Sequence, residues 1–306
     1  MSREGSMVKF IQLNETCYYF SAPVNIGYVH HGDEGLLIDA GIDDSVMRKV
    51  LRQLEEKNLP ITHLFITHAH ADHYGGASYL QERHMVKTMA PVFEAAILEN
   101  PALEPLYLFG GNVPLKELRN KFLEGKPITV AEKVEEGIYS FGSFELHTYD
   151  LSGHSYHQLG LVVDTILYAG DSYFGKEQLH KHKIPYIVDA ALTVETLEKI
   201  QTIDCTGAVP GHGEFEQEFI PTVKANLDYH HEVLDWTYET VCQYETGISH
   251  EQIIAKMCES YEVHAPTLAQ WLLFRTAATA YVIGLIKAHK LHHTIRDYKW
   301  IFQKSD

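Results

Sequence analysis

The chain has 306 residues, of which 45% are hydrophobic and 22% are charged. This length and balance allow one or two domains with a sizeable core and argue against long disorder. The formal net charge is −16, so most of the surface would repel a polyanion and we expect no nucleic-acid partner.

Neither the cysteines nor the apolar segments point to a secreted or membrane protein. The four cysteines are scattered without a CxxC pair, which argues against a disulfide framework and a zinc ribbon. The segment 1–10 lacks the apolar run of a signal peptide. The longest apolar stretch, near 277–286, is too short to cross a bilayer. We therefore expect a cytoplasmic protein with no membrane partner.

The first hundred residues alternate between strand and helix patterns. Short apolar runs bounded by turn residues indicate strands, and apolar residues three and four positions apart indicate helices. Strands are expected at 25–29, 35–39, 61–67 and 86–90, and helices at 44–57, 77–83 and 91–98.

The segment 101–126 interrupts this alternation. It contains Tyr107, Phe109, a Gly-Gly pair and Pro114, followed by a short helical pattern. Long connections of this kind are often functional, so we interpret it as an insertion or lid. A simple surface excursion explains the pattern equally well.

Strand patterns return after residue 128 and end near Gly213. Strands are expected at 137–141, 144–149, 159–163 and 166–169, and a helix at 194–201. From 214 onward the spacing is helical, with few strand signals. The sequence thus predicts a domain of alternating strands and helices at 1–215, with the insertion or lid at 101–126, and a helical C-terminal region at 216–306.

The densest group of metal-binding side chains lies in the loop directly after the strand at 61–67. This loop holds His68, His70, Asp72 and His73 within six positions. Imidazole and carboxylate are ligands that zinc, iron and manganese accept. Histidines two residues apart in an extended loop can serve one centre, and the carboxylate and histidine that follow can serve a second. We interpret the loop as a metal site rather than as surface decoration.

Three later residues have the same character. His154, Asp171 and His212 each follow a glycine, and each stands at the end of a predicted strand. Glycine permits the tight turn that aims such a side chain inward. Each signal is weak alone, but together they extend the site.

With these motifs the chain resembles the metallo-β-lactamase superfamily, and within it the glyoxalase II-like hydrolases. The resemblance covers about the first 215 residues. It implies an αββα sandwich, two mixed sheets face to face with helices outside, here followed by a helical C-terminal extension. It also implies two zinc ions, with iron or manganese as alternatives. One metal would be held by His68, His70 and His154 and the other by Asp72, His73 and His212, with Asp171 bridging. Asp39 matches a structural aspartate beneath the metal loop.

Such a site suits hydrolysis, because two cations lower the pKa of a shared water and yield a bridging hydroxide nucleophile. We expect a binuclear zinc hydrolase acting on a small ester, thioester or lactone. Asp72 would bind metal and also orient the nucleophile or pass its proton to the leaving group. Thr67, Ser152 and Ser155 would orient ligands. Tyr173 would line the pocket and act on the substrate, while Phe174 would pack in the core.

Three alternatives remain at this stage. A persulfide dioxygenase of the same fold would hold one iron through His68, His154 and Asp171. A phosphodiesterase or nuclease of the same fold conflicts with the net charge. A non-catalytic scaffold conflicts with the complete ligand set.

Among the remaining residues, His157 and the pairs 30–31, 230–231 and 292–293 are expected to be solvated or capping histidines. A small-molecule substrate is the expected partner, and a homodimer is compatible with the sequence.

Overall fold

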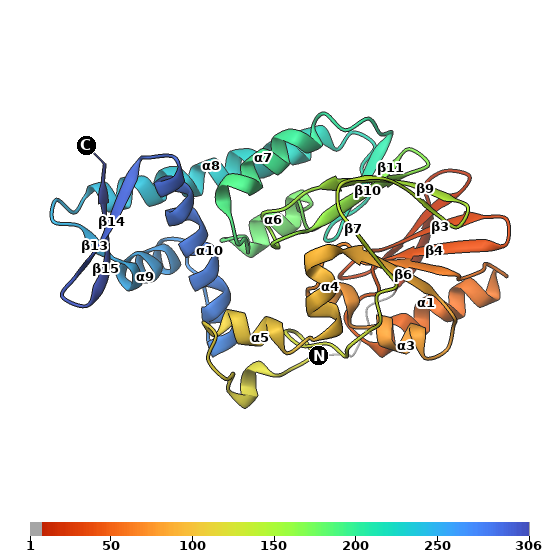
Figure 1. Cartoon of the computed structure of the whole chain (residues 1–306). Helices are drawn as coiled ribbons and strands as arrows, with labels where there is room; N and C mark the ends of the chain where they lie inside the picture. Colours follow the sequence, from red (N-terminus) through yellow and green to blue (C-terminus); the bar gives the residue numbers. More distant parts are fainter. Residues whose placement is uncertain (1–7, 306) are drawn as a thin grey trace, which may run out of the picture.

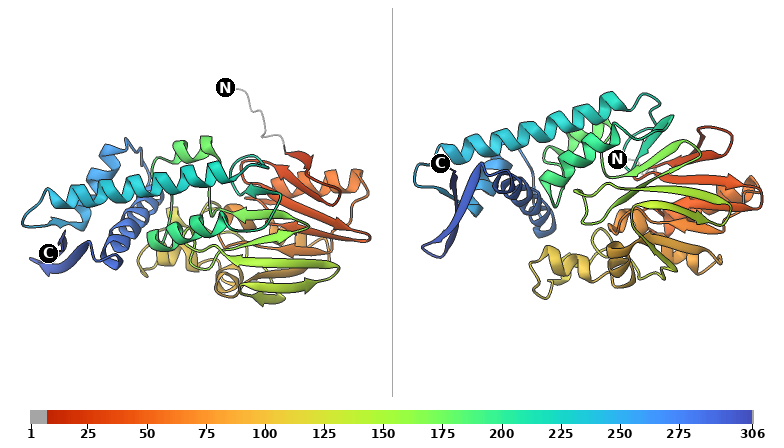
Figure 2. Two further views of the ribbon diagram at one scale, coloured as in Figure 1. Left: turned by 90° about the horizontal axis from the view of Figure 1, so that it is seen from above. Right: turned by 45° about the horizontal axis from the view of Figure 1, so that its top comes forward.

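A computed structural model describes residues 8–305, so most of the segment used to argue against a signal peptide lies outside the described residues. Two sheets face each other with helices on both outer sides (Figures 1 and 2). The first sheet runs in chain order, antiparallel from β1 to β4 and parallel from β4 to β7. Its strands are β1 (Lys9–Gln12), β2 (Cys17–Ser21), β3 (Ile26–His31), β4 (Glu34–Ile38), β5 (His63–Phe65), β6 (Lys87–Pro91) and β7 (Glu132–Val134).

The second sheet has the order β12-β11-β10-β9-β8, and only its β11–β12 pair is parallel. Phe65 and Met89 of the first sheet pack against Phe141, Leu161 and Val209 of the second. This apolar layer holds the two sheets together, because it removes both inner faces from water. The strands are β8 (Gly137–Phe141), β9 (Phe144–Asp150), β10 (Leu159–Val163), β11 (Ile166–Gly170) and β12 (Gly207–Pro210).

Helices cover the outer faces and complete the expected four-layer αββα sandwich. On the first sheet, Asp43 caps α1 (Asp44–Glu56) by accepting from the backbone of Ser45 and Val46, and the helix buries Met47, Val50 and Leu54. On the second sheet, α7 (Ala190–Ile200) and α8 (Ile220–Cys242) contribute to a separate core. Shorter helices join these outer layers: α3 (Ala77–Gln81) and α4 (Val92–Glu99) share an apolar cluster with α1, and α6 (Lys176–His182) packs against α8. The one-turn helix α2 (Ala71–Tyr74) follows the loop after β5.

The insertion forms the short helix α5 (Leu103–Leu108) and the 3₁₀ turn η1 (Lys116–Leu118). It packs against α10 (Leu268–Lys287) of the C-terminal region, as Figure 1 shows. Leu108, Leu118 and Leu123 form one apolar cluster with Leu272, and the Arg275 guanidinium donates to the carbonyl of Leu108 at 2.9 Å. The insertion therefore links the sandwich to the last third of the chain.

The C-terminal region is not purely helical, which corrects the expectation from its sequence. Besides α8, α9 (His250–Ser260) and α10, it contains the sheet β13-β15-β14, made of β13 (Ile248–Ser249), β14 (Leu291–Arg296) and β15 (Lys299–Lys304). β14 was missed because all of its residues except Leu291 are exposed, so apolar and polar residues do not alternate along it. The order helix, strand, helix, helix, strand, strand is that of a winged-helix unit, and topology alone assigns no function to it.

Helix α10 is longer than the apolar stretch seen in the sequence. Its 20 residues are long and apolar enough to cross a membrane by length and composition alone, contrary to our expectation. In the structure, however, α10 packs against α7, α8 and α9. Leu272, Ala277, Tyr281 and Leu285 are buried there. This is the environment of a core helix.

Candidate metal centre

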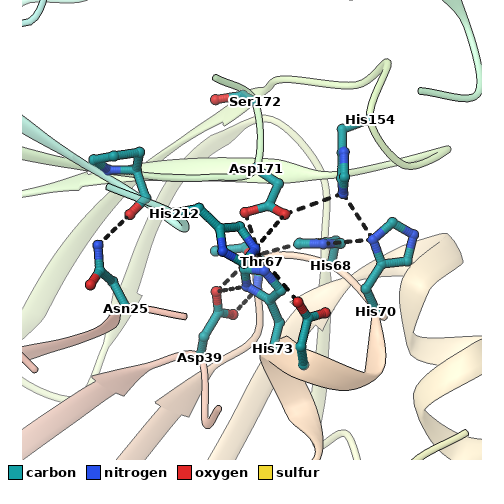
Figure 3. A network of polar contacts seen from close by, with 12 residues as sticks. Asn25, Asp39, Thr67, His68, His70, His73, His154, Asp171, Ser172 and His212 are labelled. Carbon is teal, nitrogen blue, oxygen red and sulfur yellow. Dashed lines mark hydrogen bonds and ion pairs between the residues drawn. The ribbon is translucent and has the colours of Figure 1, made fainter. Parts of the chain in front are cut away.

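All seven predicted metal ligands meet at one edge of the sandwich, where loops from both sheets converge (Figure 3). Four of them follow β5, in the loop 67–70 and helix α2. His154, Asp171 and His212 follow β9, β11 and β12 of the second sheet. The carboxyl ends of β5, β11 and β12 thus supply side chains to the same place.

The first group of ligand atoms consists of histidine nitrogens. His70 Nδ1 lies 3.0 Å from His68 Nε2 and 2.9 Å from His154 Nε2. These three imidazoles converge on one point, in the grouping that the sequence predicted for the first metal.

The second group mixes imidazole and carboxylate. His212 Nε2 lies 3.5 Å from an Asp72 oxygen and 3.3 Å from Asp171 Oδ2, and His73 Nε2 lies 3.2 Å from Asp171 Oδ1. Asp171 Oδ2 is also 3.4 Å from His154 Nε2. Asp171 therefore touches both groups and stands where a bridging ligand is required.

Hydrogen bonds outside the cluster fix the orientation of four imidazoles. His154 Nδ1 lies 2.9 Å from the Tyr186 carbonyl, and His212 Nδ1 lies 2.8 Å from that of Pro23. Because a carbonyl only accepts, each of these nitrogens carries its proton and leaves Nε2 for the centre.

The other two imidazoles are oriented by the Asp39 carboxylate. It accepts from His73 Nδ1 at 2.7 Å and from the Thr67 hydroxyl at 2.9 Å. Since the Thr67 proton is used there, the hydroxyl oxygen accepts from His68 Nδ1 at 3.0 Å. Asp39 also accepts the Thr67 backbone amide at 2.8 Å. It is thus the structural residue beneath the metal loop that the sequence predicted, and Thr67 has the expected orienting role.

The donors fit a divalent cation. His73 Nε2 and Asp171 Oδ1 are both buried, and although they lie 3.2 Å apart, neither has a hydrogen-bond partner of suitable geometry within the described part of the chain. In each of three ligand triads the donor atoms lie within 4.8 Å of one another; the triads are His68-His70-His154, His68-His73-Asp171 and Asp72-His73-His212. Unpaired buried donors that converge in this way are costly unless a cation joins them. The imidazole and carboxylate set is one that zinc, iron and manganese accept.

The charge state differs between the two ends of the cluster. Burial lowers the pKa of His70 to about 4 and that of His154 to about 3, so both are neutral donors. Burial also opposes charge at His212, but the negative charge of Asp171 outweighs it and raises the pKa to about 10. For Asp72, burial is outweighed by the hydrogen bond to His212 and the charge of His73, and the pKa falls to about 2. This end therefore attracts positive charge.

Glycine is required beside the ligands at two points. A Cβ on Gly211 would lie 2.0 Å from Asp171 Oδ1, so any larger residue would displace the bridging carboxylate. Gly153, directly before His154, has φ +128°, a conformation that other residues rarely adopt.

Glu94 is a site residue that the sequence analysis missed. Its buried carboxylate accepts from the Ala69 amide at 2.9 Å, the Ser155 hydroxyl at 2.7 Å and the His157 amide at 3.0 Å. It therefore joins the loop of His68 and His70 to the loop of His154. Ser155 supports the site through Glu94, whereas Ser152 binds Asp150 rather than a ligand, contrary to expectation.

Tyr173 and Phe174 exchange their expected places. Tyr173 is 1% exposed and belongs to the core beneath α7 and α8, and its hydroxyl has no hydrogen-bond partner. Phe174 instead lines the cavity and lies near the rings of His154 and His212. The expectation that Tyr173 lines the pocket and acts on the substrate is therefore wrong, because its side chain points into the core.

The remaining histidines mostly behave as expected. His157, His292 and His293 are exposed. His230 is the exception, because it is buried and its Nδ1 lies 2.8 Å from the Tyr281 hydroxyl. It is a core histidine that joins α8 to α10 rather than a solvated one.

A cavity of about 680 Å³ opens onto the metal centre. His70, Asp72, His154, Asp171 and His212 all face it. Its other walls come partly from the insertion and the C-terminal region, through Glu104, Lys121, Phe122, Leu123 and Leu273. A second cavity of about 380 Å³ lies on the other side of His70, and most of its lining is apolar. The space is sufficient for a small-molecule substrate.

Comparison with known proteins gives one consistent result. The model of the metallo-beta-lactamase superfamily matches residues 21–212. Over 100 residues the chain is 31% identical to a hydroxyacylglutathione hydrolase of Bradyrhizobium sp. (strain ORS 278), spanning 33% of this chain and 38% of that protein. It is 31% identical over 117 residues to a metallo-beta-lactamase type 2 of Bacillus cereus, spanning 35% and 45%. The chain thus spans less than half the length of either relative.

Among solved structures, a beta-lactamase domain protein from Burkholderia ambifaria superposes with a TM-score of 0.70 at 17% identity. The match covers 99% of this chain and 96% of that one. The likeness therefore extends through the insertion and the C-terminal region, and at this identity it concerns the fold alone.

Proposed function

The chain belongs to the metallo-β-lactamase superfamily, and from that premise we propose that it is a metal-dependent hydrolase with two zinc ions, acting on a small ester, thioester or lactone. The observation that carries the proposal is Asp171, whose carboxylate lies within 3.4 Å of inner nitrogens from both halves of the ligand cluster. A carboxylate shared in this way supports a pair of metals rather than a single one.

The ligand set assigns a place to each metal. His68, His70 and His154 would hold one ion, and Asp72, His73 and His212 the other, with Asp171 between them. Bound there, two divalent cations would supply Lewis acidity, which acidifies a water and polarises the scissile carbonyl.

Residues around the metal centre orient the ligands and handle the proton. Asp39, Thr67 and the carbonyls of Tyr186 and Pro23 hold the imidazoles in the orientation that metal binding requires. Asp72 is the ligand best placed to handle a proton, because it faces the cavity and is about one third exposed. We assign it the task of orienting the attacking water and passing a proton to the leaving group.

The apolar walls of the cavities and the name of one relative support the proposed substrate class. The walls of both cavities are mainly apolar, which suits an uncharged acyl or aryl group better than a polyanion. The relative from Bradyrhizobium is named for hydrolysis of hydroxyacylglutathione, which is a thioester. With the net charge of −16, these features favour a small neutral or weakly charged substrate in the cytoplasm over nucleic acid.

The proposal is tested by metal content and turnover together. Protein purified without a histidine tag is analysed by mass spectrometry for metals and assayed on thioester, aryl ester and lactone panels. We expect about two zinc ions per chain and hydrolysis of at least one panel. One iron per chain, with oxygen uptake on a persulfide and no hydrolysis, would instead identify a dioxygenase.

Variants localise the activity. His68→Ala and Asp171→Ala are expected to lose most of the metal and activity while the sandwich stays folded by circular dichroism. His292→Ala is the matched control, since His292 is exposed on β14 of the C-terminal sheet. Full turnover in either ligand variant would refute the site assignment.

A further inference from the structure

Two buried glutamates stand on neighbouring helices beside the metal centre, and they differ in their bonding. Glu94 on α4 accepts three hydrogen bonds from the metal loops. Glu104 on α5 is also buried, with 5% of its surface exposed, but its Oε2 has no hydrogen-bond partner among residues 8–305. The hydrogen bonds of Glu94 are therefore complete in the free protein, whereas one oxygen of Glu104 remains without a bond.

Glu104 faces the cavity that opens onto the metal ligands. Its charged surroundings are acidic: burial raises the pKa of Glu104 well above its ordinary value, and the charges of Asp72 and Glu94 raise it further. Lys121 lines the same cavity, but its ammonium is 2.8 Å from an Asp43 oxygen. Within residues 8–305, the charges that act on Glu104 are those of the two acidic residues.

A buried carboxyl group without a partner destabilises the folded state. Such groups persist mainly where a ligand completes the bonding, so that the unfavourable contribution is recovered in the complex. A group that bonds to Glu104 Oε2 must enter the cavity that the metal ligands also line. A bound substrate occupies that same cavity.

We propose that Glu104 is a specificity-determining residue whose free carboxyl oxygen, Oε2, accepts a hydrogen bond from an N–H group of the substrate, close to the scissile carbonyl. A carboxyl group that keeps its proton still accepts through its carbonyl oxygen. An amide N–H or an ammonium group satisfies an acceptor that has two acidic neighbours, and a purely hydrocarbon acyl group does not. This inference rests on the hydrolase function proposed above and narrows its substrate class to acyl groups that bear nitrogen near the reacting carbon.

The position of α5 supports this role. Leu108, at the end of the same helix, packs against Leu272 of α10, and its carbonyl is held by Arg275. Glu104 is therefore carried by a segment that is anchored to the C-terminal region, so its carboxyl group is presented to the cavity from a fixed support.

The first test compares two ester substrates that differ only in having NH or CH₂ at one position. The 4-nitrophenyl ester of N-acetylglycine carries an amide N–H, and the 4-nitrophenyl ester of 4-oxopentanoic acid has CH₂ in its place. We expect the wild-type protein to prefer the amide ester by about tenfold or more in kcat/KM, since a site built for a hydrogen bond discriminates against an analogue that lacks it. Glu104→Met should abolish this preference, and Glu104→Gln, which keeps an acceptor oxygen, should retain part of it.

The second readout does not depend on activity. Because Glu104→Met removes a buried polar group without a partner, we expect its Tm to equal or exceed that of the wild type, with zinc content unchanged. A structural residue would show the opposite, as Glu94→Met should. The matched control is Glu117→Met, an exposed glutamate of the same insertion, which should alter neither the preference nor the Tm.

The two proposals fail in different ways. If the wild type hydrolyses none of the ester, thioester and lactone panels, the hydrolase function fails. If the wild type is active but shows no preference for the N–H ester, or if Glu104→Met keeps that preference or lowers the Tm, only the role of Glu104 is refuted.

Discussion

The carboxylate of Glu94 and the hydroxyl of Ser155 are 2.7 Å apart, and this contact joins two metal-ligand loops that are more than eighty residues apart in the chain. The same carboxylate holds the Ala69 amide, between His68 and His70. The spacing of His68, His70 and His154 therefore depends on a residue that touches none of their nitrogens.

We predict that Glu94→Gln weakens metal binding at the three-histidine group by roughly 10- to 100-fold, because its amide nitrogen cannot accept the bonds that one carboxylate oxygen now receives. Competition with a chromophoric chelator measures the affinity. Glu99→Gln, on the same helix and paired with Lys133 at the surface, is the control. Unchanged zinc affinity in Glu94→Gln would show that the loops hold their spacing without it.

Asp39→Asn tests the orientation of His73. The substitution suits the backbone, because asparagine tolerates the φ of +64° at this position. It leaves only one accepting oxygen for the Thr67 amide, the Thr67 hydroxyl and His73 Nδ1. We expect zinc affinity to fall by roughly 10- to 100-fold and kcat to fall with it at limiting zinc. Recovery of kcat at saturating zinc would indicate loss of affinity alone, and normal affinity in the variant would contradict the role of Asp39.

Metal removal is expected to destabilise the folded protein. Zinc and protons are also expected to compete for His212. Without a cation, the carboxylate of Asp171 raises the pKa of His212 to about 10 despite its burial, so His212 is protonated at neutral pH. Zinc binding must displace that proton, and affinity should therefore decrease as pH falls. Calorimetry in two buffers of different ionisation enthalpy measures the proton release. Zinc at 100 times its Kd should stabilise the fold by about 2.7 kcal/mol.

The variant Tyr173→Phe distinguishes the core position of Tyr173 in the structure from the catalytic role expected from the sequence. The Tyr173 hydroxyl is buried in the core without a partner, so its removal should leave kcat within about twofold and raise the free energy of unfolding by up to about 1 kcal/mol. Phe174→Ala, by contrast, removes a wall of the cavity and should raise KM. Urea unfolding and steady-state kinetics measure both effects. A large loss of kcat in Tyr173→Phe would restore the catalytic role expected from the sequence.

His230 should make the fold sensitive to acid. Burial lowers its pKa from the ordinary value of 6.5 to about 3, so the unfolded chain binds a proton that the folded protein does not. The contribution of His230 to stability is therefore full above pH 6.5 and is lost as pH falls towards 3, with a slope approaching about 1.4 kcal/mol per pH unit. Chelator-treated wild type and His230→Gln, unfolded in urea from pH 7 to 4.5, should differ by this slope. Parallel curves would contradict the assignment.

Local signals in the sequence predicted the strands, the helices and the seven candidate ligands, whereas the sandwich was implied by the resemblance to a known family. Four of the ligands lie within six positions after an apolar strand, and the other three each follow a glycine. Glu94 could not be found in this way, since a glutamate in a short helix is ordinarily a surface residue, and its partners come from two distant loops.

The roles of Tyr173 and Phe174 could not be predicted for a related reason. The two aromatic residues lie in the loop after β11, and the path of that loop decides which of them enters the core. The contacts between the insertion and α10 depend on Arg275 and Leu108, which are 167 positions apart, so no local pattern records them.

The convergence of both sheets on one edge has a consequence for assembly of the protein. His212 Nδ1 is held by the Pro23 carbonyl, Asn25 donates to the Pro210 carbonyl at 2.8 Å, and the Leu159 amide donates to the Thr67 carbonyl at 3.1 Å. None of these bonds can form until the second sheet has docked on the first. During synthesis the complete ligand set therefore becomes available only after residue 212 has left the ribosome, so metal capture would follow the docking of the two sheets and protect the sandwich against re-opening at that edge.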